Sequence, residues 1–326
     1  MRRWVWVLVV LVSGGGVWGD FMPLLTTIGN PGNPPDQPYL KYGNPDVYVG
    51  AVGYTYRITT YEITVGQYVD FLNHKARSDP HGLYHPDMAD PLLEGGAFIL
   101  RSGEEGSYVY TAVAGKENQP VRYVSFWDGL RLANWMHNGQ GDGDTEDGAY
   151  TLTNGIWLTR NPGARWALPS NDEWHKAAHY DPATGEYREY PNGKDTIEEP
   201  SDETTPRELN FGDTPLWQHS VVFTSVGETT GQSAYGVCDM GGNVAEWTDS
   251  LNPPGQGHYR IVRGGWYMSA SNYLARDGWV SDDPSAEGVG YGLRLVYLVP
   301  EPGVSGLVMV GGGMLLGCLR RRRRWC

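Results

Sequence analysis

The feature that most constrains this chain is a glycine-rich segment, Gly236–Trp247, with the sequence GVCDMGGNVAEW. Gly241 and Gly242 permit backbone angles that a side chain would forbid. Asp239 and Glu246 can then turn their oxygens inward beside exposed peptide carbonyls, and calcium prefers such oxygen ligands. The segment therefore predicts a structural calcium site, although a tight turn whose acids face water is the alternative. The expected ligands are Asp239, Gly242, Val244 and Glu246.

Further motifs lie on both sides of this segment and keep a fixed order along the chain. Two follow it, namely RGGWY at Arg263–Tyr267 and GYGLRLV at Gly290–Val296. Three precede it, namely YEIT at 61–64, PVRYVS at 120–125 and RWALPSNDEW at 165–174. Together they resemble the formylglycine-generating, or sulfatase-modifying factor, family over roughly residues 45–297. The resemblance implies an α+β, C-type-lectin-like fold that is rich in loops, with few helices and short antiparallel strands.

Three helix starts can be expected from the sequence. Thr64, Ser125 and Ser170 each precede an apolar helical pattern and are suitable N-caps. Ser170 and Glu173 also have the spacing of a capping box. Apolar residues recur at helical spacing behind Thr64, at Val65, Tyr68, Phe71 and Leu72. Glycine and proline number 45 and 22 in the 326 residues, which favours turns and loops over long helices elsewhere.

The charge of the chain argues against nucleic-acid binding. The net charge is −13, with 25 basic and 38 acidic residues. Seven of the basic residues lie within 1–19 and 303–326, which carry no acid, so the main body is more acidic still. Nucleic-acid binding needs a basic face to contact phosphates. Of the three cysteines, only Cys238 lies in the globular part, so no disulfide framework is expected there.

The N-terminal region divides into two segments. Residues 1–19 place two arginines before an apolar run and then small residues, the order of a secretory signal peptide. A buried N-terminal strand is the alternative. Residues 20–45 are rich in Pro, Gly and Asn and are expected to form an extended lead-in to one domain at 46–298.

The tail at 299–326 combines three features. Pro300–Pro302 is Pro-Glu-Pro, residues 304–319 are apolar, and Arg320–Arg324 are five arginines. This tail resembles the bacterial PEP-CTERM sorting signal, and the resemblance implies an exosortase-type sorting machinery as partner. An ordinary tail anchor is the alternative. Either way we expect an exported protein of the cell surface or extracellular matrix, transiently held in the membrane by this segment.

Several histidines have spacings that suggest metal ligands. His81 and His85 lie near Asp87, but the segment is loop-like. His175 and His179 are four residues apart and would share one helix face, yet no third ligand can be named. We therefore interpret the second pair as core or surface histidines.

The family resemblance also bears on redox chemistry. Its catalytic members hold copper through two cysteines and use oxygen to make formylglycine. Alignment on the Arg-Gly-Gly motif places Ser269 and Leu274 at those two positions. Serine is a poor ligand for soft copper and leucine is none, so copper and formylglycine generation are not expected and no catalytic residue is assigned. Other relatives, the sulfoxide synthases of ergothioneine biosynthesis, take iron ligands largely from an extra helical domain for which this chain has no room.

Two functions of different classes follow. The first is a non-catalytic binding or structural module that contacts an extracellular polysaccharide or a protein. Its expected contact residues are Trp266, Tyr267, Ser269 and Tyr273. The second is a metal-dependent oxidoreductase of this family with an altered metal site. The missing cysteine pair favours the first.

Overall fold

The structure is a computed structural model that describes residues 22–36, 48–89, 98–198, 206–212, 223–252 and 258–299. The expected signal peptide, and the tail beyond residue 299, lie outside these residues. Within the described part, no helix is long and apolar enough to cross a membrane.

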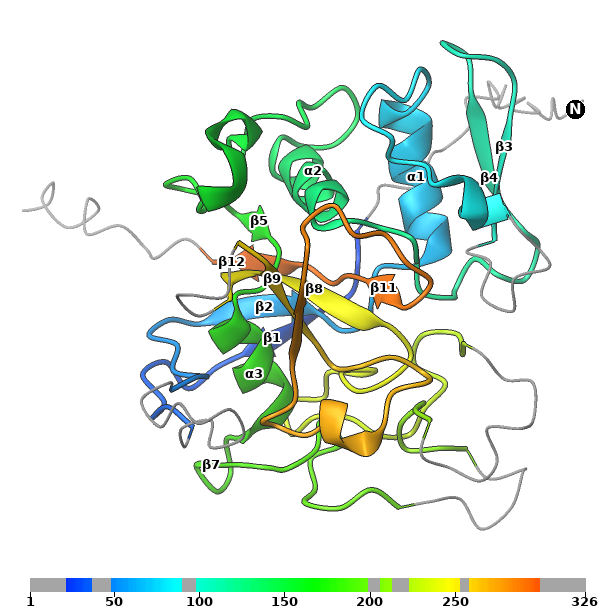
Figure 1. The fold of residues 1–326 in the computed structure, drawn as a ribbon. Helices are drawn as coiled ribbons and strands as arrows, with labels where there is room; N and C mark the ends of the chain where they lie inside the picture. The colour runs from blue at the N-terminus through cyan, green and yellow to red at the C-terminus, as the bar shows by residue number, and fades with distance from the viewer. Residues whose placement is uncertain are drawn as a thin grey trace, which may run out of the picture.

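One four-stranded sheet joins the two ends of the domain (Figure 1). Its order is β1 (Leu25–Ile28), β2 (Tyr56–Thr59), β12 (Val296–Leu298) and β5 (Trp166–Ala167). All three pairings are antiparallel. The last strand of the described part therefore lies between two strands from much earlier in the chain.

A second four-stranded sheet contains the glycine-rich segment. Its order is β10 (Val280–Asp282), β9 (Arg260–Arg263), β8 (Ala245–Leu251) and β11 (Tyr291–Gly292). β8, β9 and β10 are antiparallel, whereas β11 runs parallel to β8. β10 thus forms one edge of this sheet.

Two small hairpins complete the strands of the described part. They pair β3 (Ile99–Ser102) with β4 (Val109–Ala112), and β6 (Tyr180–Asp181) with β7 (Glu186–Tyr187).

The three expected helices form where their caps predict them. These are α1 (Val65–Lys75), α2 (Phe126–His137) and α3 (Asn171–His179). Each begins with a complete capping box, made by Thr64 with Gln67, by Ser125 with Asp128 and by Ser170 with Glu173. The reciprocal bonds satisfy backbone N–H groups that have no partner inside the helix. Short 3-10 turns lie at Pro86–Ala89, Leu152–Trp157 and Ser271–Tyr273.

Two helices cover opposite faces of the second sheet (Figure 1). The alternation of side chains along β8 explains this arrangement. Trp247 points to α2, where its ring lies 6.4 Å from the ring of Phe126. Its neighbour Glu246 points to α3 and accepts a hydrogen bond from Trp174. The few helices, short strands and many loops confirm the predicted α+β class.

Candidate functional site

The glycine-rich segment is built around a buried ion pair. Both oxygens of Glu246 accept from Arg294, with Nε 2.5 Å from Oε2 and Nη2 2.7 Å from Oε1. The indole of Trp174 donates to Oε2 as well, at 2.7 Å. Arg294 also donates to the carbonyls of Cys238 and Asp239, at 3.0 and 3.3 Å. A guanidinium, which carries five donors in a rigid fork, thus holds the acid and the carbonyls together.

This arrangement bears on the predicted calcium site. The Asp239 carboxylate accepts from the Gly227 amide at 2.6 Å and the Thr229 hydroxyl at 2.7 Å. Glu246 is bound by Arg294 and Trp174, as described above. Calcium needs several oxygens that are free to point at one centre, and these oxygens point at donors. In the structure both carboxylates are therefore held by protein donors, and the calcium site stays a prediction.

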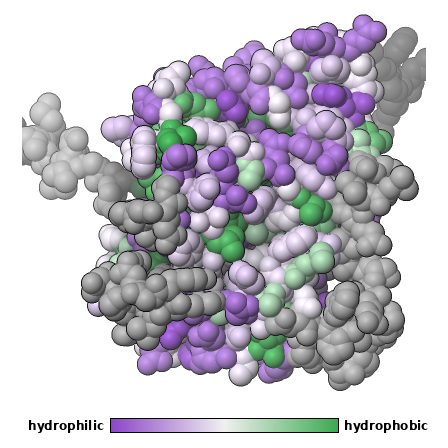
Figure 2. Space-filling model, viewed as in Figure 1, coloured by the Kyte–Doolittle hydropathy of each residue, from purple (hydrophilic) through white to green (hydrophobic). Residues whose placement is uncertain are grey.

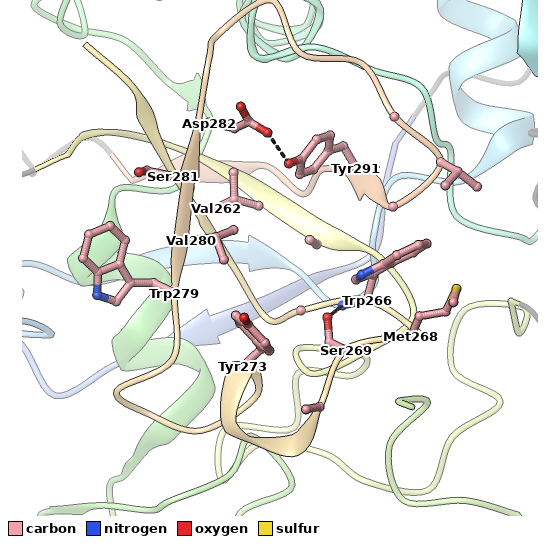
Figure 3. Close-up of a pocket in the computed structure, with 16 residues that line it drawn as sticks. Val262, Trp266, Met268, Ser269, Tyr273, Trp279, Val280, Ser281, Asp282 and Tyr291 are labelled. Atoms are coloured by element: carbon pink, nitrogen blue, oxygen red, sulfur yellow. Dashed lines mark hydrogen bonds between the residues drawn. The ribbon is translucent and has the colours of Figure 1, made fainter. Parts of the chain in front are cut away.

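A pocket of about 740 Å³ lies against β10. Its floor is apolar and includes Val262 of β9 and Val280 of β10. Trp266 and Tyr273 lie on one side and Tyr291 on another, and Figure 3 shows Val280 and Asp282 directed inward from β10. Ser281 and Trp279 point to the other side of this strand, as the period of a strand requires.

One hydrogen-bonded pair gives the pocket its polar end. The Tyr291 hydroxyl donates to Oδ2 of Asp282 at 2.5 Å, and the Asp283 amide donates to Oδ1 at 2.8 Å. Burial and the neighbouring Asp282 raise the pKa of Tyr291, so the phenol stays protonated and keeps donating. Asp282 is the only Asp, Glu, Lys, Arg or His among the sixteen lining residues of the described chain.

Of the four residues expected to contact a ligand, three line the pocket and one does not. Trp266, Ser269 and Tyr273 line the pocket. Tyr267 does not, because its ring packs against Phe223 with centroids 4.5 Å apart. The structure adds Asp282 and Tyr291, which no sequence motif indicated as ligand contacts. Ligand binding by this set stays a prediction.

The loop that contains Gly288 forms one pocket wall, and contacts with Tyr123 and His85 hold it in place. Gly288 lines the pocket, and its carbonyl accepts from the Tyr123 amide at 3.1 Å. The Tyr123 ring stacks on His85, with centroids 5.2 Å apart and planes at 7°. His85 Nε2 lies 3.8 Å from the carboxylate of Glu287, the residue before Gly288. Burial, with Asp128 and Asp79 nearby, raises the pKa of Glu287 to about 7.

We expect Glu287→Gln to change the pH dependence of stability. The raised pKa means that the folded protein favours the neutral form of Glu287. The stability that Glu287 contributes is therefore complete below the ordinary pKa of about 4.3 and is lost as pH rises through about 7. Glutamine mimics the neutral form. The variant should therefore gain about 1 kcal/mol over the parent between pH 4.5 and 8.5, a figure that allows for solvent screening. Urea unfolding at both pH values measures this difference.

Glu146→Gln is the control of opposite sign. Although burial raises the pKa of Glu146, hydrogen bonds from Arg131 hold it below the usual range. Its contribution is present above the ordinary pKa and is lost on acidification, so this variant should lose stability at the higher pH. A Glu287→Gln difference that does not vary with pH would contradict the assignment.

The histidine pair on α3 is buried. The exposed fractions of His175 and His179 are 0% and 1%. His175 Nε2 lies 2.8 Å from Asp36 Oδ2, and Nδ1 faces the guanidinium of Arg263. Burial and the Arg263 charge hold the pKa of His175 well below its usual range, so the ring is neutral. These are core histidines, and no group of three potential ligands is present among the described His, Cys, Asp and Glu residues.

Comparison with known proteins gives the family. The profile of the Sulfatase-modifying factor enzyme 1-like domain matches residues 47–298. This chain belongs to that family.

Curated relatives of this sulfatase-modifying-factor-like chain are oxygenases. The hercynine oxygenase of Mycobacterium tuberculosis is 35% identical over 196 residues, 55% of this chain and 37% of the relative. That of Mycolicibacterium thermoresistibile is 31% identical over 157 residues, 41% of this chain and 33% of the relative. The chain thus spans about a third of the length of these relatives.

Solved structures share the fold. CarF has a TM-score of 0.56 at 17% identity, covering 86% of this chain and all of that one. Treponema denticola variable protein 1 has a TM-score of 0.54 at 17% identity, covering 84% and 94%. PvdO from Pseudomonas aeruginosa has a TM-score of 0.50 at 16% identity, covering 86% and 96%. At these identities the likeness shows the fold alone.

The structure brings together the two positions at which the family resemblance implies copper cysteines. A Cβ atom added to Gly265 would lie 3.0 Å from both Ser269 Cβ and Leu274 Cδ1. The Ser269 hydroxyl accepts from the Trp266 amide at 3.0 Å, and Leu274 is buried against Leu209 and Phe211. A hydroxyl and a buried methyl group do not fit soft copper, which thiolates bind.

Proposed function

We propose that this chain is an exported, surface-associated, non-catalytic binding module of the sulfatase-modifying factor family, with the pocket beside β10 as its ligand site. One observation carries the proposal. The positions at which the resemblance implies copper cysteines hold Ser269 and Leu274, and Ser269 lines a pocket that is otherwise suited to binding. Such a site keeps a recess for a ligand without the thiolates of the copper reaction.

The lining of the pocket supports ligand binding. Trp266, Tyr273 and Tyr291 provide aromatic area, and Asp282 with the Tyr291 hydroxyl provides direction. Ligand sites commonly combine an apolar wall with a few placed polar groups. Elsewhere, the face in Figure 2 is mainly hydrophilic, with its described hydrophobic residues in small separate areas. A ligand that binds at this face would thus make most of its apolar contacts inside the pocket beside β10.

We expect Trp266→Ala to weaken ligand binding at least tenfold, because its ring contributes a pocket wall. Binding is measured by calorimetry with the strongest hit from a screen of glycans and peptides. Trp157→Ala is the matched control, since that side chain is 65% exposed and lies outside the lining. Equal losses in both variants would count against the pocket.

A second function is favoured by the hercynine oxygenase relatives at 35% and 31% identity. It is a metal-dependent oxidoreductase with an altered metal site. Elemental analysis and oxygen-consumption assays of the purified protein separate the two. Stoichiometric iron or copper together with oxygen uptake would contradict the binding module and support the oxidoreductase.

Export and sorting are part of the proposal and rest on the sequence of the two ends. The order of charged, apolar and small residues at 1–19 supports export, and the Pro-Glu-Pro, apolar and arginine order at 299–326 supports an exosortase-type partner. Mass spectrometry of the protein from its own cells tests this. Loss of about the first 19 residues and a new C-terminus near Pro-Glu-Pro are expected. An intact chain would exclude processing.

A further inference from the structure

We infer that the pocket takes a neutral sugar residue of a glycan and discriminates against acidic sugars. The inference rests on the proposed binding function and names the ligand class of the same site. It is drawn from the shape, the polar groups and the charge of the lining.

The walls suit a sugar ring. Figure 3 shows Trp266 and Tyr273 around the cavity, with Tyr291 on another side and Val280 between them. A pyranose ring has a flat face of C–H groups that packs on an aromatic face or an apolar floor. The volume of about 740 Å³ falls in the range of roughly 300–1,000 Å³ found for sites of small organic ligands.

The orientation of Trp266 is fixed before any ligand arrives. Its amide donates to the Ser269 hydroxyl oxygen at 3.0 Å, and the Ser269 amide donates back to the Trp266 carbonyl at 2.8 Å. Its ring meets the ring of Tyr267 at 82°, with centroids 4.9 Å apart. A wall that is already ordered loses little side-chain entropy on binding, so more of the stacking energy appears as affinity.

The polar end suits hydroxyl groups. Each oxygen of Asp282 already accepts one hydrogen bond, from Tyr291 or from the Asp283 amide, and each carboxylate oxygen has a second lone pair. Two neighbouring hydroxyls of a sugar can donate to those lone pairs.

The charge of the pocket sets the discrimination. Asp282 is its only Asp, Glu, Lys, Arg or His among the described lining residues. A uronic acid or a sulfated sugar would place a second negative charge beside Asp282, with no cation among the described lining residues to balance it. Two like charges in a partly apolar recess repel more strongly than in water. Neutral sugars carry no such penalty.

The test is calorimetry of the full protein with neutral gluco-, manno- and galacto-oligosaccharides, with oligogalacturonate and with short lysine-rich peptides. We expect at least one neutral oligosaccharide to bind more than tenfold tighter than oligogalacturonate. Trp266→Ala should weaken it at least tenfold, and the outside variant Trp157→Ala should leave it unchanged. Asp282→Asn removes the charge and should reduce the ratio of the affinity for the neutral oligosaccharide to the affinity for oligogalacturonate severalfold.

Each other outcome overturns the inference. Tighter binding of oligogalacturonate, or an unchanged ratio in Asp282→Asn, would show that charge does not select the ligand. Peptide binding that depends on Trp266, or no binding of any neutral sugar at millimolar concentration, would remove the sugar but leave the binding module. Metal-dependent oxygen uptake would instead remove the proposed function itself.

Discussion

Replacing Gly242 with alanine is expected to destabilise the fold by more than about 4 kcal/mol, enough to abolish cooperative unfolding. Gly242 has a φ of +82°, and a Cβ atom there would lie 2.0 Å from the carbonyl oxygen of Asn210. That oxygen cannot swing aside, because it belongs to the main chain and accepts from the Asn243 amide at 2.8 Å. Soluble expression and thermal unfolding followed by circular dichroism measure the effect.

Gly236→Ala separates backbone strain from the clash. Gly236 has the same φ of +82°, but an added Cβ atom there meets nothing within 4 Å. This variant should lose only about 1–2 kcal/mol, the ordinary cost of a side chain in the left-handed region. If Gly242→Ala melted within a few degrees of Gly236→Ala, the close approach to Asn210 would be wrong.

Replacing Arg294 with methionine should cost about 3–5 kcal/mol, because it leaves a buried carboxylate without its partner. Arg294 and Glu246 are 0% and 1% exposed. The double variant Arg294→Met/Glu246→Gln should be more stable than Arg294→Met, since the uncompensated charge is gone and the amide oxygen can still accept from Trp174. Guanidinium chloride unfolding of the parent and variants gives these differences.

Arg131→Met is the surface control for this experiment. Arg131 pairs with Glu146, whose side chain is 36% exposed, so its loss should cost less than about 1 kcal/mol. Similar losses for Arg131→Met and Arg294→Met would mean that the ion pair of the glycine-rich segment is not special. A double variant no more stable than Arg294→Met would contradict the role of the stranded charge.

The local parts of this fold could be predicted from the sequence. Thr64, Ser125 and Ser170 each begin a helix, because a capping box is complete within four residues. The family and its α+β fold could be predicted as well, since short motifs keep their order along the chain. These predictions need no knowledge of distant contacts.

The chemistry of the glycine-rich segment could not be predicted in the same way. The sequence predicts Glu246 as a calcium ligand because its carboxylate can turn inward beside peptide carbonyls, and it indicates no protein partner for this acid. In the structure that partner is Arg294, which lies 48 residues further along the chain. Asp282 and Tyr291 likewise meet only because β10 and β11 flank the same sheet. Period and spacing along a sequence do not specify such pairings.

The position of β12 has a mechanical consequence. This strand lies between β2 and β5, and the chain leaves the described fold at residue 299, directly after it. A force applied at residue 299 acts on the hydrogen bonds of β12 to both β2 and β5 at once, whereas an edge strand has hydrogen bonds to one neighbour only. In a molecule held by its C-terminal end, the force would thus be borne by an inner strand of the sheet, with hydrogen bonds on both of its sides.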